Sequence, residues 1–75
     1  MDWHQLIECK PEVQDGKPVF KGTRMTVEFV LERLSQGATA EELVQNYIAL
    51  RPEHIQAALA YAAALLRRDE LVFSA

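Results

Sequence analysis

Three cations stand close together in the first third of the chain: Lys17, Lys21 and Arg24. No acidic residue lies between Asp15 and Glu28, so this stretch could contact the phosphate groups of a nucleic acid or the acidic surface of a protein partner. A dimer would present the stretch twice. We favour structural alternatives, in which Arg24 pairs with a carboxylate or with carbonyl groups at a helix end and the two lysines are simply solvated.

Residues that could act as catalysts or metal ligands are few and poorly spaced. His4 and His54 are the only histidines, and the spacing between His4 and Cys9 matches no known nucleophile or metal site. The side chains of the neighbours Glu41 and Glu42 diverge, so they form no acid/base pair. The glycines are isolated, which excludes a Walker loop and a dinucleotide-binding fingerprint. We therefore expect no enzyme, no cofactor and no metal site.

The size and composition are those of one globular domain. The chain has 75 residues and a formal net charge of −3, with 49% hydrophobic and 25% charged residues. It contains no apolar run of the ~18 residues that a membrane span needs, and its first residues lack the order of a secretory signal. We expect a cytoplasmic protein with no membrane partner, in which Cys9 is a reduced thiol packed as a small hydrophobe.

The small size also predicts a partner chain. A domain of this length buries only about 60% of the surface of its unfolded chain, so its core contributes little stability. The single cysteine cannot form an internal disulfide, and no metal site is expected. The simplest further stabilisation is a second copy, and we therefore expect a homodimer.

The first 24 residues carry strand and turn patterns. Short apolar runs predict two strands, near residues 5–9 and 18–24. Between them, Asp15-Gly16 favours a turn, because glycine accepts a positive φ and aspartate tolerates it. Gly22 interrupts the second run and predicts a bulge or a bend. Trp3, which precedes the first strand, is expected to pack over the helices.

Residues 25–68 carry three helical patterns joined by short turns. The first helix has an apolar stripe with the spacing i, i+3, i+4, i+7, made of Val27, Val30, Leu31 and Leu34. The second begins with a capping box, in which Thr39 caps the helix and Glu42 reaches back to the Thr39 amide. Its buried face is expected to contain Leu43, Val44 and Tyr47.

The third helix is predicted to begin at Pro52, because proline suits the first helical position. Its expected buried stripe consists of Ile55, Leu59, Ala62 and Leu66. Six alanines between residues 57 and 64 raise its helix propensity and permit close approach of another element.

These elements predict an α+β fold that is mainly α. A short N-terminal strand pair is followed by a three-helix unit of the helix-turn-helix or homeodomain-like kind. A plain three-helix bundle without any nucleic-acid role fits the pattern equally well. The single domain, residues 1–75, divides into a strand and turn arm (1–24), the three-helix unit (25–68) and a C-terminal tail (69–75).

Residues 15–27 carry a signature that points to a known family. Their sequence, DGKPVFKGTRMTV, resembles the GGKPVIKGTRIPV core of domain-of-unknown-function family 433. Residues 34–43 are similar to the family pattern L-x-x-G-x-S-x-E-E-I, and residues 47–62 resemble its Y-P-x-L…E-D-I-x-A-A-L-x-Y-A segment. The resemblance covers roughly residues 6–64, and its Gly-Lys-Pro…Gly-Thr-Arg pairing is its most specific part.

The resemblance implies a small bacterial or archaeal domain with a homeodomain-like helical part. Members of the family are regarded as antitoxin-like and are commonly encoded beside a PIN-like ribonuclease toxin, in the manner of type II toxin–antitoxin pairs. By this resemblance the protein would bind and inhibit such a toxin, and would also bind the operator DNA of its own operon.

The chain departs from the family pattern at four positions. Asp15 replaces a glycine in the turn, and Thr26 replaces a proline before the first helix. Ile48 replaces the proline that follows Tyr47 in the pattern. Arg51 stands where serine or threonine would cap the third helix; because arginine cannot cap and its charge opposes the helix dipole, this departure removes a start signal of the helix.

The charges of the helical half do not favour DNA binding. Residues 25–75 hold four basic and seven acidic residues, and Glu41 and Glu42 in the second helix would repel phosphate. If a recognition helix exists, it is the third, with Arg51, His54 and Gln56 near its N-terminal end. The predicted nucleic-acid contacts are thus Lys17, Lys21, Arg24, Arg51, His54 and Gln56.

The C-terminal tail contains an apolar segment, Leu71, Val72 and Phe73. Its simplest role is a closing contact with its own domain or with the second copy. The alternative is a partner-binding segment that docks in a groove of the toxin. The whole-protein alternative to an antitoxin is a non-catalytic dimeric interaction or structural module that does not bind DNA.

Overall fold

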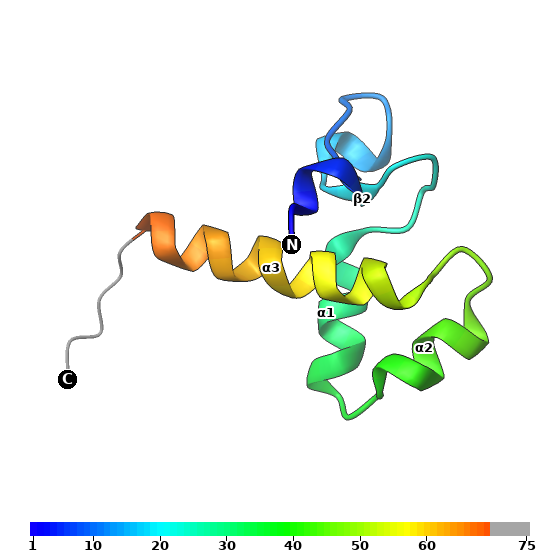
Figure 1. The fold of residues 1–75 in the computed structure, drawn as a ribbon. Coiled ribbons are helices and arrows are strands. Elements are labelled where there is room, and N and C mark those ends of the chain that lie inside the picture. Colours follow the sequence, from blue (N-terminus) through cyan, green and yellow to red (C-terminus); the bar gives the residue numbers. More distant parts are fainter. Residues whose placement is uncertain (70–75) are drawn as a thin grey trace, which may run out of the picture.

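The structure is a computed structural model that describes residues 1–69, with side chains described as far as Arg67. Two short strands and two 3-10 turns are followed by three α-helices (Figure 1). In chain order the elements are η1 (Trp3–Gln5), β1 (Ile7–Glu8), η2 (Gln14–Gly16), β2 (Val19–Phe20), α1 (Val27–Ser35), α2 (Ala40–Asn46) and α3 (Pro52–Asp69). The predicted α+β, mainly α architecture is confirmed.

The sheet is smaller than the apolar runs predicted. β1 and β2 pair antiparallel, with Ile7 opposite Phe20 and Glu8 opposite Val19. The chain turns directly after Phe20, because Gly22 takes a φ of 78° and the Phe20 N–H donates to the Met25 carbonyl at 3.1 Å. The bend predicted at Gly22 is therefore confirmed, and it explains why β2 ends well before residue 24.

The core lies where β2 meets the three helices. Phe20, Val19 and Val30 are fully buried. The stripes predicted for α1 and α2 face this core, with Val27, Val30 and Leu43 buried and their remaining members partly buried. In both helices the local apolar spacing predicted the buried face correctly.

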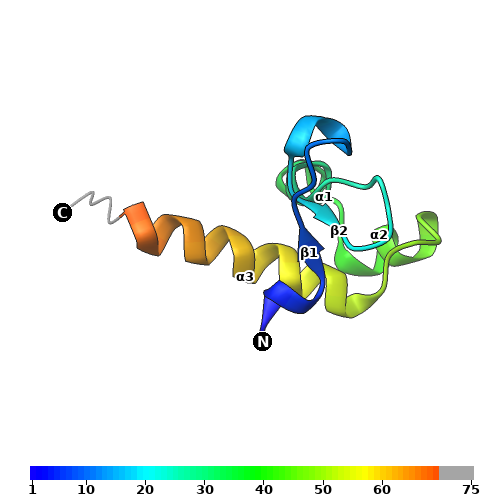
Figure 2. The ribbon, with the colours of Figure 1, turned by 90° about the horizontal axis from the view of Figure 1, so that it is seen from above.

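The buried face predicted for α3 is wrong at its two later leucines. Leu59 is 52% exposed and Leu66 is 67% exposed, whereas Ala57 and Ala58 are fully buried. The small alanine side chains let the α3 backbone approach the body of the domain closely, and this turns the leucines outward. The C-terminal half of α3 also projects beyond the rest of the molecule, as Figures 1 and 2 both show.

The N-terminal residues cover one side of α3. Trp3 meets the Tyr61 ring edge-on at a centroid distance of 4.8 Å and stacks on His4 at 3.7 Å, so its predicted packing over the helices is confirmed. Cys9, by contrast, is exposed and not packed. The physical reason is that β1 ends at Glu8, so the alternation of the strand does not carry Cys9 into the core. Over residues 1–69, no helix has the length and apolar character needed to cross a membrane.

Candidate nucleic-acid interface

The loop between β2 and α1 is shaped by two residues of the Lys-Gly-Thr-Arg signature. Gly22 supplies the positive φ that the turn requires. The Thr23 hydroxyl donates to the Phe20 carbonyl at 2.8 Å and accepts from the Met25 N–H at 3.0 Å. Gly22 and Thr23 therefore hold the backbone, while Lys21 and Arg24 on either side of them expose their side chains.

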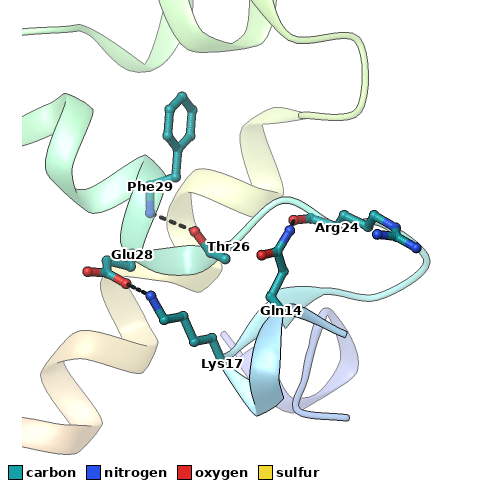
Figure 3. A network of polar contacts seen from close by, with 6 residues as sticks. All are labelled: Gln14, Lys17, Arg24, Thr26, Glu28 and Phe29. Atoms are coloured by element: carbon teal, nitrogen blue, oxygen red, sulfur yellow. Dashed lines mark hydrogen bonds and ion pairs between the residues drawn. The ribbon is translucent and has the colours of Figure 1, made fainter. Parts of the chain in front are cut away.

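Arg24 is anchored by its backbone and not by its charge. Its carbonyl accepts from Gln14 Nε2 at 3.2 Å, and its side chain extends away from this contact into the open (Figure 3). Among residues 1–67, no carboxylate or helix-end carbonyl lies within bonding distance of the guanidinium. The structure thus gives no support to the structural alternative for Arg24, and leaves its charge available to a ligand.

Lys17 and Lys21 differ in their surroundings. The Lys17 ammonium lies 3.2 Å from Glu28 Oε1, and both side chains are exposed (Figure 3). Such a surface pair contributes about 0–1 kcal/mol but partly neutralises the lysine. Lys21 is exposed and has no ion pair within the described part of the chain. Of the three predicted cations, Lys21 and Arg24 are the ones that the structure leaves uncompensated.

The start of α3 is held by His54. The Arg51 N–H donates to His54 Nδ1 at 2.9 Å, so this nitrogen acts as the acceptor that a capping side chain would supply. The His54 ring also meets the Phe20 ring edge-on at a centroid distance of 5.1 Å. α3 therefore begins cleanly at Pro52 although Arg51 cannot cap it.

This role of His54 was missed from the sequence. The signal was present in the spacing Arg51-x-x-His54, because the third residue after a cap position is where a capping box places its acceptor. The half-buried ring is engaged with Phe20 and with the backbone, so His54 positions α3 and is not free to read a base.

The Phe20–His54 contact brings the loop and the start of α3 together. Lys21 follows Phe20, and Arg51 is tied to His54, so cations from two segments far apart in sequence lie at one end of the molecule. Figures 1 and 2 both show the β2–α1 loop and the start of α3 at the end of the molecule opposite the C-terminal end of α3. We call the exposed cations Lys21, Arg24 and Arg51 the basic end.

The predicted contact Gln56 lies elsewhere, on the outer face of α3. It is exposed and lines a groove between α2 and α3, together with Glu41. The capping box at the start of α2 is confirmed: Glu42 accepts from the Thr39 N–H at 2.8 Å, and the Glu42 N–H donates to Thr39 Oγ1 at 3.1 Å. The Glu42 carboxylate at this helix start is thus engaged in capping α2.

Within residues 1–67, the other polar groups form no further site. At the N-terminus, the hydrogen bond from His4 holds the pKa of the Asp2 carboxyl below its usual value. The described residues contain no group of three or more histidine, cysteine, aspartate or glutamate side chains that could hold a metal ion. The predicted partner segment, Leu71, Val72 and Phe73, lies outside the described residues.

Comparison with known proteins gives one result. The family model described as "Protein of unknown function (DUF433)" matches residues 7–62, which is well over half of the chain. No curated protein and no solved structure matches.

Proposed function

Because the chain belongs to the DUF433 family, we propose that it is the antitoxin-like member of a type II toxin–antitoxin pair. In this role it binds and inhibits a PIN-like ribonuclease toxin in the cytoplasm and, as a homodimer, binds the operator DNA of its own operon. The toxin and operator roles follow from the family resemblance in residues 15–27.

The observation that carries the operator part of the proposal is the basic end. Lys21 and Arg24 are exposed, uncompensated and held on a loop whose shape Gly22 and Thr23 fix. A rigid loop with two free cations, next to the start of a helix that follows a short turn, is suited to phosphate contact. The charges are few, so the expected affinity is modest and depends strongly on salt.

A gel-shift or fluorescence-anisotropy titration tests the operator role, with the DNA upstream of the protein's own gene as the probe. We expect binding at about 50 mM salt that falls steeply towards 200 mM. The double variant Lys21→Ala/Arg24→Ala should weaken binding to all sequences and reduce the salt slope by about one for each phosphate that is no longer neutralised.

The matched control is Arg33→Ala, which removes an exposed cation on α1 that lies over the Phe29 ring, 5.8 Å from its centroid. It should leave DNA binding nearly unchanged. If the wild-type dimer shifts no upstream fragment at low salt, or if Arg33→Ala weakens binding as much as the double variant, the operator role of the basic end is refuted.

The toxin role is tested separately, by co-expression with the product of the neighbouring gene. We expect the two proteins to co-purify and the nuclease activity of the partner to be suppressed. A neighbouring gene that encodes no protein with clustered aspartates, or a partner that purifies alone and stays active in the presence of this chain, would contradict the proposal.

A second candidate function is a non-catalytic dimeric interaction module without DNA binding. The outer face of α3 favours it, because Leu59 and Leu66 are exposed there and no lysine or arginine occurs between Pro52 and Leu66. A recognition helix would be expected to offer polar or basic side chains on that face. Absence of a DNA shift together with a stable dimer would favour this candidate.

A further inference from the structure

The outer face of α3 carries an uncharged stripe with the spacing of a helix-pairing seam. Its five members follow one another at intervals of four and three residues, and all are exposed: Pro52, Gln56, Leu59, Ala63 and Leu66. This alternation places them along one line of a helix, as the core positions of a coiled coil are placed. We call these five residues the seam.

The seam is the part of α3 that the fold leaves uncovered. α3 buries a different face, on which Ala57 and Ala58 are fully inaccessible. Leu59 and Leu66 are 52% and 67% exposed, which is unusual for two leucines on the same face of one helix. Since the C-terminal half of the helix also projects from the body (Figure 2), a second helix has room to lie along this half of the seam.

We propose that the seam pairs with the seam of a second copy, with the two α3 helices antiparallel. This deepens the homodimer included in the proposed function by assigning its interface. The small Ala63 near the middle lets the helix axes approach closely. In the antiparallel register that sets Leu59 of one copy beside Ala63 of the other, Leu66 of each copy lies beside Gln56 of its partner.

The charges that flank the seam favour this direction. Glu53 follows Pro52 and Arg67 follows Leu66, so both flank the seam on the same side. In an antiparallel pair the same flanks meet, and Glu53 of each copy then faces Arg67 of the other. In a parallel pair each flank meets the opposite one, which carries the uncharged Ile55 and Ala62, and neither charge has a partner.

The groove beside the seam fits the projecting half of the partner helix. α2 and α3 enclose an apolar groove of about 430 Å³, whose lining includes Val44, Gln56 and Glu41. In the proposed register Leu66 of the second copy reaches Gln56 and enters this groove. The apolar groove thus offers a place for a leucine side chain of the second copy.

The test measures the oligomeric state by light scattering and sedimentation, without DNA or toxin. We expect a dimer whose dissociation constant rises roughly 100-fold in Leu59→Glu and in Leu66→Glu, because each change removes two buried leucines per dimer. Ile48→Glu is the matched control: Ile48 is fully exposed outside the seam, and its replacement should leave the dimer intact.

The direction of the helices is tested by charge exchange. Glu53→Arg and Arg67→Glu should each weaken the dimer about threefold to tenfold at low salt, and the double exchange, which keeps the net charge, should restore it. Circular dichroism of every variant checks that the fold is kept.

Three results would overturn the inference. They are a wild-type monomer at micromolar concentration, a folded Leu66→Glu variant that stays as dimeric as Ile48→Glu, and a double exchange weaker than both single ones. All three results are measured in the absence of the toxin. They therefore do not affect the co-purification test of the proposed function, which can succeed or fail separately.

Discussion

Residues 14–16 form a turn in which three successive residues take a positive φ. Gln14 and Asp15 have φ values of 49° and 57°, and Gly16 has 83°. The turn also places the Gln14 side chain against the Arg24 carbonyl at 3.2 Å, which ties it to the loop of the basic end. The left-handed region is costly for side chains, least so for aspartate and asparagine and not at all for glycine.

This turn predicts opposite responses to two small substitutions. Gly16→Ala should lower the free energy of unfolding by about 1 kcal/mol or more, because alanine is strained at this φ. Asp15→Gly should change it by less than about 0.5 kcal/mol, because relief of strain is offset by the greater entropy of the unfolded chain. Denaturant titrations at one fixed protein concentration measure both. Equal losses in the two variants would contradict the role of φ at residue 16.

The contacts and the exposure of single side chains were the hardest features to predict from the sequence. The turn at Asp15-Gly16 and the bend at Gly22 were predicted because glycine acts through its own backbone. The freedom of the Arg24 side chain and the burial of the His54 ring were not, because both depend on which distant atoms come near them. The exposure of Cys9 has the same cause, since the strand ends one residue earlier than its pattern indicated.

At the scale of elements, α1 and α2 are helices whose starts and buried faces could be predicted from the local sequence. Each is capped by the threonine that precedes it, whose hydroxyl accepts a hydrogen bond from a backbone N–H. Thr26 accepts from the Phe29 N–H at 3.0 Å, and Thr39 accepts within the capping box. Their caps and apolar spacing act within one or two turns, so the sequence alone predicted their faces. The Thr26 cap also shows that the departure from proline still leaves α1 a defined start.

α3 shows where local pattern fails. A hydrophobicity scale favours leucine over alanine for burial, yet here Ala57 and Ala58 are buried and Leu59 is not. The short distance between α3 and the body of the domain decides which residues are buried, because it leaves room for alanine side chains but not for leucine side chains. Which face of α3 is buried depends on the elements that pack against the helix and not on the sequence of the helix itself. For this reason the seam could be recognised only from the structure.

The start of α3 predicts a clear result for His54 variants. His54→Ala should lower the free energy of unfolding by about 1–2 kcal/mol, because it removes the acceptor of the Arg51 N–H and the packing of the imidazole on the Phe20 ring. His54→Gln keeps an acceptor at the same position and should recover part of this stability.

The measurement that distinguishes the roles of His54 combines stability with DNA affinity. If His54 positions the helix, the substitutions lower the free energy of unfolding. DNA affinity then changes little when it is measured at a temperature where both variants are folded. If His54 reads a base, affinity for the operator falls in both variants while affinity for an unrelated sequence stays the same. The second pattern would show that the half-buried ring leaves its place on binding.

At the scale of the whole molecule, the size of the buried core relative to the exposed apolar surface decides whether one chain is stable without a partner. Within the described residues, the fully buried side chains larger than alanine are few, namely Phe20, Val19, Val27 and Val30, while several leucines remain at the surface. A core of this size leaves little net stability after the loss of chain entropy. Pairing along the seam would bury Leu59 and Leu66, so association and folding should be coupled.

Coupling of this kind makes the melting temperature depend on protein concentration. For two chains of this length the unfolding enthalpy is roughly 100 kcal/mol, so a tenfold rise in concentration should raise the melting temperature by roughly 5 °C. Leu66→Glu should melt lower at high concentration and lose this dependence, whereas Ile48→Glu should keep it. A wild-type melting temperature that is the same from the lowest to the highest concentration would mean that one chain completes its own core. The exposed leucines of α3 would then have to serve a different partner, whose binding, and not self-association, should raise the melting temperature.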